Sequence, residues 1–118
     1  MNNLSNLKIP NEYRVFLHIL LSAMQNDERI DEIILFGSCA RQNVGQHSDV
    51  DIAIITKEQL STQEELSFYD YLMVIDLKSY IDCDLLIMSR KQFDEHKDSN
   101  FFVQKYIGLE GVKLHESV

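Results

Sequence analysis

Apolar residues recur at steps of three and four between Pro10 and Asn26, which is typical of one buried face of a helix. The residues of this stripe are Tyr13, Phe16, Leu17, Leu20, Leu21 and Met24. Pro10 suits the first position of the helix, because its missing N–H is no loss there. The segment is therefore predicted to be a helix that packs on the core.

Short apolar runs predict the strands. The run at residues 33–36 is continuous and ends at Gly37, as in a strand covered on both faces. β-Branched residues dominate 50–56, and a further apolar run covers 84–88. The C-terminal segment 112–116 is predicted to be a short edge strand.

Two polar pairs mark helix starts. Ser61 is followed by Glu64 and Ser89 by Gln92, each at the spacing of a capping box. The helix after Ser61 is expected to pack through Leu66, Tyr69, Leu72, Met73 and Leu77. A last helix is expected from near Asn100, ending at Gly111 and using Phe102, Val103, Tyr106 and Ile107.

These elements predict one α/β (α+β) domain over residues 1–118, with a small mixed sheet of three or four strands and helices packed on one side. A chain of 118 residues has the length of a single domain. No repeat, low-complexity stretch or linker interrupts it.

Net charge and cysteine content limit the classes of function and the cellular location that the sequence is compatible with. The net charge of −8 argues against direct binding of nucleic acid through its backbone. A negatively charged small ligand is still compatible, because a divalent cation inverts the local field. The chain has two cysteines outside any CxxC pair, no signal-peptide pattern at its start and no apolar run of membrane-spanning length. We expect a cytoplasmic protein with no membrane contact.

Candidate chemistry begins where the run 33–36 ends. Gly37 lets a ligand approach the backbone closely, and Ser38 offers a hydroxyl and is expected to be the N-cap of a helix. Free N–H groups at such a turn suit phosphate.

Asp49 and Asp51 lie two positions apart on a predicted strand, so their side chains share one face. Mg²⁺ prefers such oxygen ligands, and two ions about 3.5–4 Å apart can activate a hydroxyl and stabilise a leaving pyrophosphate. Asp84 completes a triad if its strand lies beside that of Asp51; Asp82, the alternative, is expected in the preceding loop. The alternative interpretation is that Asp49 and Asp51 are solvent-facing residues of a half-exposed strand.

The sequence GSCAR at 37–41, followed by SDVDI at 48–52, closely resembles a signature of the minimal nucleotidyltransferases of the DNA polymerase β-like superfamily. The segment CDLL at 83–86 is similar to that family's third-aspartate strand. One departure is Gln42, which stands where the family has glycine. Glutamine is strained at a positive φ, which puts the local loop geometry in question.

The resemblance implies a polymerase β-like fold and transfer of a nucleoside monophosphate, often AMP from ATP, with two Mg²⁺ ions. The implied catalytic and metal-binding residues are Asp49, Asp51 and Asp84. The implied nucleotide-binding residues are Gly37, Ser38, Arg41 and Ser48, although Arg41 is equally well read as a surface residue of a helix.

Members of this length are often paired with a HEPN-type toxin, so the resemblance implies an antitoxin in a hetero-oligomer that adenylylates a tyrosine of its partner. Two alternatives stay open. The chain neutralises its partner by contact alone, or it modifies a small hydroxylated molecule.

Overall fold

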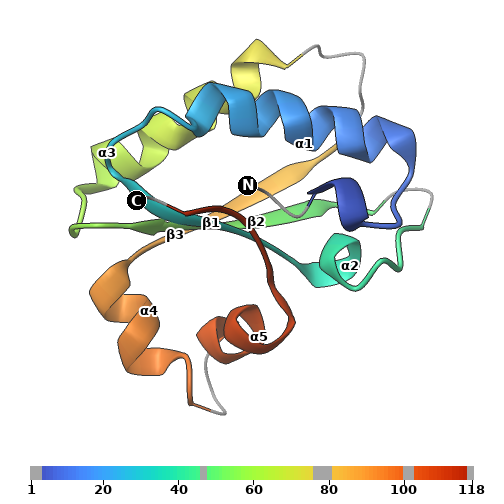
Figure 1. Cartoon of the computed structure of the whole chain (residues 1–118). Helices are drawn as coiled ribbons and strands as arrows, with labels where there is room; N and C mark the ends of the chain where they lie inside the picture. The colour runs from blue at the N-terminus through green and yellow to red at the C-terminus, as the bar shows by residue number, and fades with distance from the viewer. Residues whose placement is uncertain (1–3, 46–47, 76–80, 100–102, 117–118) are drawn as a thin grey trace.

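The computed structural model describes residues 4–45, 48–75, 81–99 and 103–116, and its centre is a four-stranded sheet (Figure 1). The strands are β1 (Ile30–Phe36), β2 (Val50–Thr56), β3 (Cys83–Ser89) and β4 (Val112–Glu116), in the order β3-β2-β1-β4. β2 runs parallel to β3, while β1 is antiparallel to both β2 and β4. The mixed sheet and the edge position of 112–116 are confirmed.

Helices cover both faces of this sheet (Figure 1). On one face lies α1 (Asn11–Met24), with the 3-10 helix η2 (Phe68–Val74) beside it and η1 (Leu4–Asn6) before it. On the other face lie α4 (Arg90–His96) and α5 (Val103–Glu110). The fold class is confirmed, but the expectation that helices pack on one side is wrong.

The reason is visible in the strands. Ile33 and Leu35 of β1 are buried against the α1 side, while Ile34 between them is buried against the α4 and α5 side. Successive side chains of a strand point to opposite faces, so a continuous apolar run needs a cover on each face of the sheet.

In the part of the chain that the structure describes, no helix combines the length and the apolar character that crossing a membrane requires.

Most of the helix features predicted from local sequence patterns are confirmed. The α1 stripe is buried, and both capping boxes form, at Ser61 with Glu64 and at Ser89 with Gln92. The segment after Ser61 differs from expectation, because α3 (Thr62–Ser67) gives way to the tighter winding of η2. Phe68, the first residue of η2, is fully buried.

The exposed side chains of this segment and of α5 include several that were expected to pack. Leu66 is 60% exposed, Tyr69 41% and Met73 79%, and on α5 Tyr106 is 55% exposed although Ile107 is buried. For Tyr69 and Met73 the reason is the 3-10 winding of η2, because three residues per turn move the apolar positions off the spacing of an α-helix. Leu77, Asn100 and Phe102 lie outside the described residues.

Candidate functional site

The end of β1 and the starts of β2 and β3 meet at one edge of the sheet. Phe36, the last residue of β1, pairs with Asp51 of β2, and Asp51 pairs with Asp84 of β3. The pairing confirms that the strand of Asp84 lies beside that of Asp51. Since paired residues project to the same side of a sheet, the two carboxylates share a face.

That face is the one beneath α4 and α5, because Asp51 alternates with the buried Ile52 and lies in line with Ala53 and Ile55. Asp49 lies two positions before Asp51, just outside β2, and is exposed. Asp82 lies in the loop before β3, where its carbonyl oxygen accepts the Val50 N–H at 2.8 Å.

Gly37 forms the turn at this edge. Its φ is +73°, and a side-chain carbon at this position would collide with Asp51 Oδ2. The short helix α2 (Gly37–Ala40) starts at once, with Phe36 in the N-cap position and no side chain capping it. Ser38 therefore lies inside the helix, and the expectation that it caps the helix is wrong, because the left-handed glycine lets the chain turn one residue earlier.

The electrostatics of the edge centre on Asp51. Burial raises the pKa of the Asp51 carboxyl, and the charges of Asp84 and Asp49 raise it further. Arg41 acts in the opposite direction on the same pKa. The three aspartates are thus close enough for their charges to repel one another.

This donor set suits a hard divalent cation, since carboxylate oxygens are the ligands that Mg²⁺ takes and a cation would relieve the repulsion. Over the described residues, however, no three His, Cys, Asp or Glu side chains converge as a group that could hold a metal ion. The aspartates fit the ion by chemistry and by sharing an edge, and binding would have to draw their carboxylates together.

Arg41 and Ser48 already have partners. Arg41 ends α2 and forms an exposed ion pair with Glu110 of α5, with Nη1 3.3 Å from Oε2. The Ser48 hydroxyl oxygen, just before Asp49, accepts the Gly45 N–H at 2.7 Å. Both residues lie near the edge that carries the aspartates.

Gln42 adopts a φ of +58°, in the left-handed region. The position where the sequence departs from the family's glycine is therefore the position where a side chain is strained. The Gln42 Oε1 atom accepts the Lys8 backbone N–H at 2.5 Å, which ties the N-terminal segment to the loop after α2.

One contact of the site was missed from the sequence. The Tyr13 hydroxyl of α1 donates to the Ser48 carbonyl oxygen at 2.8 Å. Tyr13 was expected only as a member of the buried stripe. The available signal was its residue type, because a buried tyrosine hydroxyl usually needs a hydrogen-bond partner.

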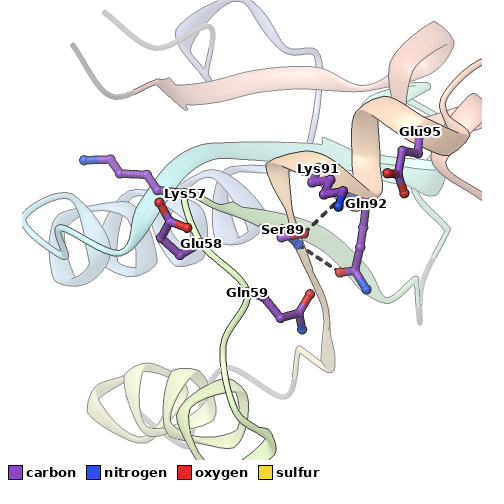
Figure 2. Close-up of a pocket in the computed structure, with 7 residues that line it drawn as sticks. All are labelled: Lys57, Glu58, Gln59, Ser89, Lys91, Gln92 and Glu95. Atoms are coloured by element: carbon purple, nitrogen blue, oxygen red, sulfur yellow. Dashed lines mark hydrogen bonds between the residues drawn. The ribbon is translucent and has the colours of Figure 1, made fainter.

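A cavity of about 420 Å³ lies at the opposite end of β2 and β3 (Figure 2). It is lined by Lys57, Glu58, Gln59, Ser89, Lys91, Gln92 and Glu95. Ser89 and Gln92 hydrogen-bond to each other in the capping box that starts α4 (Figure 2). This cavity is separate from the aspartates, which lie where the two strands begin.

The chain is similar to known proteins in sequence and in fold. The family model described as Polymerase beta, Nucleotidyltransferase matches residues 20–99, which include all three aspartates. No curated protein matches the chain.

Three solved structures have the same fold. A toxin–antitoxin crystal structure with AMP-PNP has a TM-score of 0.58 and 20% identity, covering 92% of this chain and 75% of that one. A tyrosine-to-alanine mutant of the toxin–antitoxin MntA-HpeT has a TM-score of 0.54 and 22% identity, covering 92% and 74%. A double aspartate-to-glutamate mutant of that complex has a TM-score of 0.56 and 18% identity, covering 92% and 75%.

Proposed function

This chain belongs to the polymerase beta nucleotidyltransferase family, and on that premise we propose that it transfers AMP from ATP to a tyrosine hydroxyl of a HEPN-type toxin, as the antitoxin of the pair. The observation that carries the proposal is the register of β2 and β3, which sets Asp84 beside Asp51 at the edge where Gly37 turns. The similar complexes add support: one contains AMP-PNP, an analogue of ATP. Another has two aspartates replaced at a spacing of two, the spacing of Asp49 and Asp51.

In this proposal the chain's residues divide the work. Asp49 and Asp51 would hold Mg²⁺, which would supply positive charge at the phosphates and favour deprotonation of the acceptor hydroxyl. Gly37 and Ser38 bring backbone N–H groups to the triphosphate, and Arg41 leaves Glu110 to contact a phosphate oxygen.

Asp84 orients the acceptor hydroxyl and takes its proton. The hydroxyl oxygen attacks the α-phosphorus, the bond from that phosphorus to the pyrophosphate breaks, and pyrophosphate leaves. Burial, followed by the charges of Asp84 and Asp49, raises the pKa of Asp51, and a bound cation would offset the repulsion among these carboxylates.

The test is to mix the protein with labelled ATP, Mg²⁺ and a HEPN partner and to measure label on the partner by mass spectrometry. We expect one AMP added per modified tyrosine, and no addition with the double variant Asp49→Asn and Asp51→Asn. Label that persists in this variant would refute the assignment. The matched control is the double variant Asp82→Asn and Asp94→Asn, which changes two carboxylates outside the triad. We expect it to keep the transfer activity.

A second candidate is an antitoxin that neutralises its partner by contact alone. Within the described residues, the lack of three converged metal-binding side chains and the strained Gln42 favour it. It predicts that complex formation and inhibition survive both the double aspartate change and the omission of ATP. The two candidates therefore give opposite results in the same assay.

A further inference from the structure

We propose that Tyr13 is a positioning residue for Asp49: from inside the core, its hydroxyl holds the backbone that carries this carboxylate at the sheet edge. The inference rests on the proposed transferase function, in which Asp49 holds the divalent cation. Tyr13 itself touches no reacting group and acts through the chain segment at Ser48.

The geometry begins with the burial of Tyr13. Its side chain is 4% exposed in the first turn of α1, and its hydroxyl donates to the Ser48 carbonyl oxygen at 2.8 Å. Ser48 directly precedes Asp49. A ring of the same size without the hydroxyl would fill the core equally well, so the hydroxyl itself serves the contact with this carbonyl.

A second side chain reaches the same segment from α2. The Cys39 thiol is fully buried, and its Sγ lies 3.8 Å from the Asp49 carbonyl oxygen as a weak donor. The Val50 N–H donates to the Asp82 carbonyl oxygen at 2.8 Å. Three consecutive residues are thus anchored through their backbones, from α1, from α2 and from the chain before β3.

These anchors matter because Asp49 lies outside the regular pairing. β2 starts at Val50, and its pairing with β1 stops at Asp51. The Asp49 side chain is exposed, so no packing around it sets its direction. The contacts from Tyr13 and Cys39 therefore hold the backbone from which this side chain extends.

Small errors in aim are costly at such a site. A displacement of about 1 Å can lower a rate by roughly 100-fold, and loss of a group that orients a metal ligand commonly costs about 10–100-fold in metal affinity. We therefore expect the loss of the Tyr13 hydroxyl to weaken cation binding more than nucleotide binding, since Gly37 and Ser38 contact the triphosphate independently.

The experiment uses Tyr13→Phe in the full chain. Mn²⁺ binding is followed by the loss of the free-ion paramagnetic resonance signal, and AMP transfer to the HEPN partner is measured against Mg²⁺ and against ATP. We expect about tenfold weaker Mn²⁺ binding, a matching rise in the Mg²⁺ concentration for half-maximal rate, and a KM for ATP within about twofold of the wild type.

The matched control is Tyr71→Phe. It also removes a tyrosine hydroxyl from a hydrogen bond, at 2.6 Å to Asp27 Oδ2, but at the other end of β1. It is expected to leave Mn²⁺ binding unchanged. Cys39→Ala, which removes the second anchor and keeps the tyrosine ring, is expected to shift Mn²⁺ binding in the same direction as Tyr13→Phe by about two- to threefold.

Wild-type Mn²⁺ binding in Tyr13→Phe, or equal losses in both tyrosine variants, would overturn the positioning role. A wild-type protein that transfers no label, while Tyr13→Phe still weakens Mn²⁺ binding selectively, would reject the transferase function and support the positioning role. The two failures are therefore told apart by the binding measurement.

Discussion

The backbone of Gly37 lies directly against the carboxylate of Asp51, so that a side chain on Gly37 would occupy the space of Asp51 Oδ2. Phe36, the residue before Gly37, is also the register partner of Asp51. The turn that starts α2 and the carboxylate at the start of β2 are therefore built as one unit, and each restricts what the other can be.

Gly37→Ala should disturb both parts of this unit. Alanine at a φ of +73° costs about 1–2 kcal/mol in backbone strain, and the added carbon also displaces the Asp51 carboxylate. We expect a loss of unfolding free energy of at least about 1 kcal/mol in urea titrations, together with loss of AMP transfer. Gly45→Ala is the control, because among the described residues its added carbon meets Ser48 Oγ alone, at an ordinary contact distance of 3.6 Å. Equal stability of the two variants would contradict the close approach.

Asp51→Asn should separate stability from activity. Burial and the charges of Asp84 and Asp49 raise the pKa of Asp51, so its ionised form destabilises the fold without a cation. In EDTA at pH 7 we expect the variant to be more stable by about 1 kcal/mol, the order of one like-charge contact in water, and to transfer no AMP. Asp82→Asn should change neither. A less stable Asp51→Asn protein would show that Asp51 does not bear this repulsion.

Gln42 combines a cost with a contact. Its φ of +58° costs about 1 kcal/mol for a residue other than glycine, whereas its hydrogen bond with the Lys8 N–H contributes about 0.5–1.5 kcal/mol. Gln42→Gly loses the bond and the strain together and should be nearly neutral. Gln42→Ala loses only the bond and should be less stable than Gln42→Gly by about 1 kcal/mol in chemical denaturation. The reverse order would mean that the position is unstrained.

Arg90 joins α4 to the start of β1. Its Nη2 lies 2.7 Å from Asp31 Oδ2 and 2.5 Å from Glu32 Oε1, and the Glu32 side chain is only 12% exposed. Arg90→Met leaves that carboxylate half-paired with Lys113 and should cost about 1–3 kcal/mol of unfolding free energy. Lys97→Met breaks only an exposed pair with Asp94 and should cost less than about 0.5 kcal/mol. A double-mutant cycle of Arg90 and Glu32 with no coupling would contradict this account.

Ionisation of the Asp27 carboxyl makes the free energy of unfolding depend on pH in the acid range. The hydrogen bond from the Arg29 side chain lowers the pKa of Asp27 to about 2, and a bond from Tyr71 acts in the same direction. Since the folded pKa lies below the unfolded one, the stabilisation is complete above about pH 4 and is lost as the pH falls toward 2, by about 2 kcal/mol in total. Urea titrations from pH 5 to 2 should show the gap between wild type and Asp27→Asn closing over this window. A gap that stays constant would assign the effect to other groups.

Several features followed from the sequence alone because they depend on local spacing. The α1 stripe and the two capping boxes are set by the period of a helix and the geometry of a first turn. The strain at Gln42 was also foreseeable, since it needs only a residue type and the φ that a glycine would otherwise take. The transfer chemistry stays a prediction.

The tertiary structure alone decided how those elements meet. Spacing along the chain sets where a side chain points from its own element, but not which element lies opposite, because that depends on covering all apolar surface at once. Helices thus lie on both faces of the sheet, Leu66 and Met73 are exposed, and Arg41 pairs with Glu110 across 69 positions. The bond from Tyr13 to Ser48 belongs to the same class: it joins residues 35 positions apart, and only packing α1 onto the sheet brings them together.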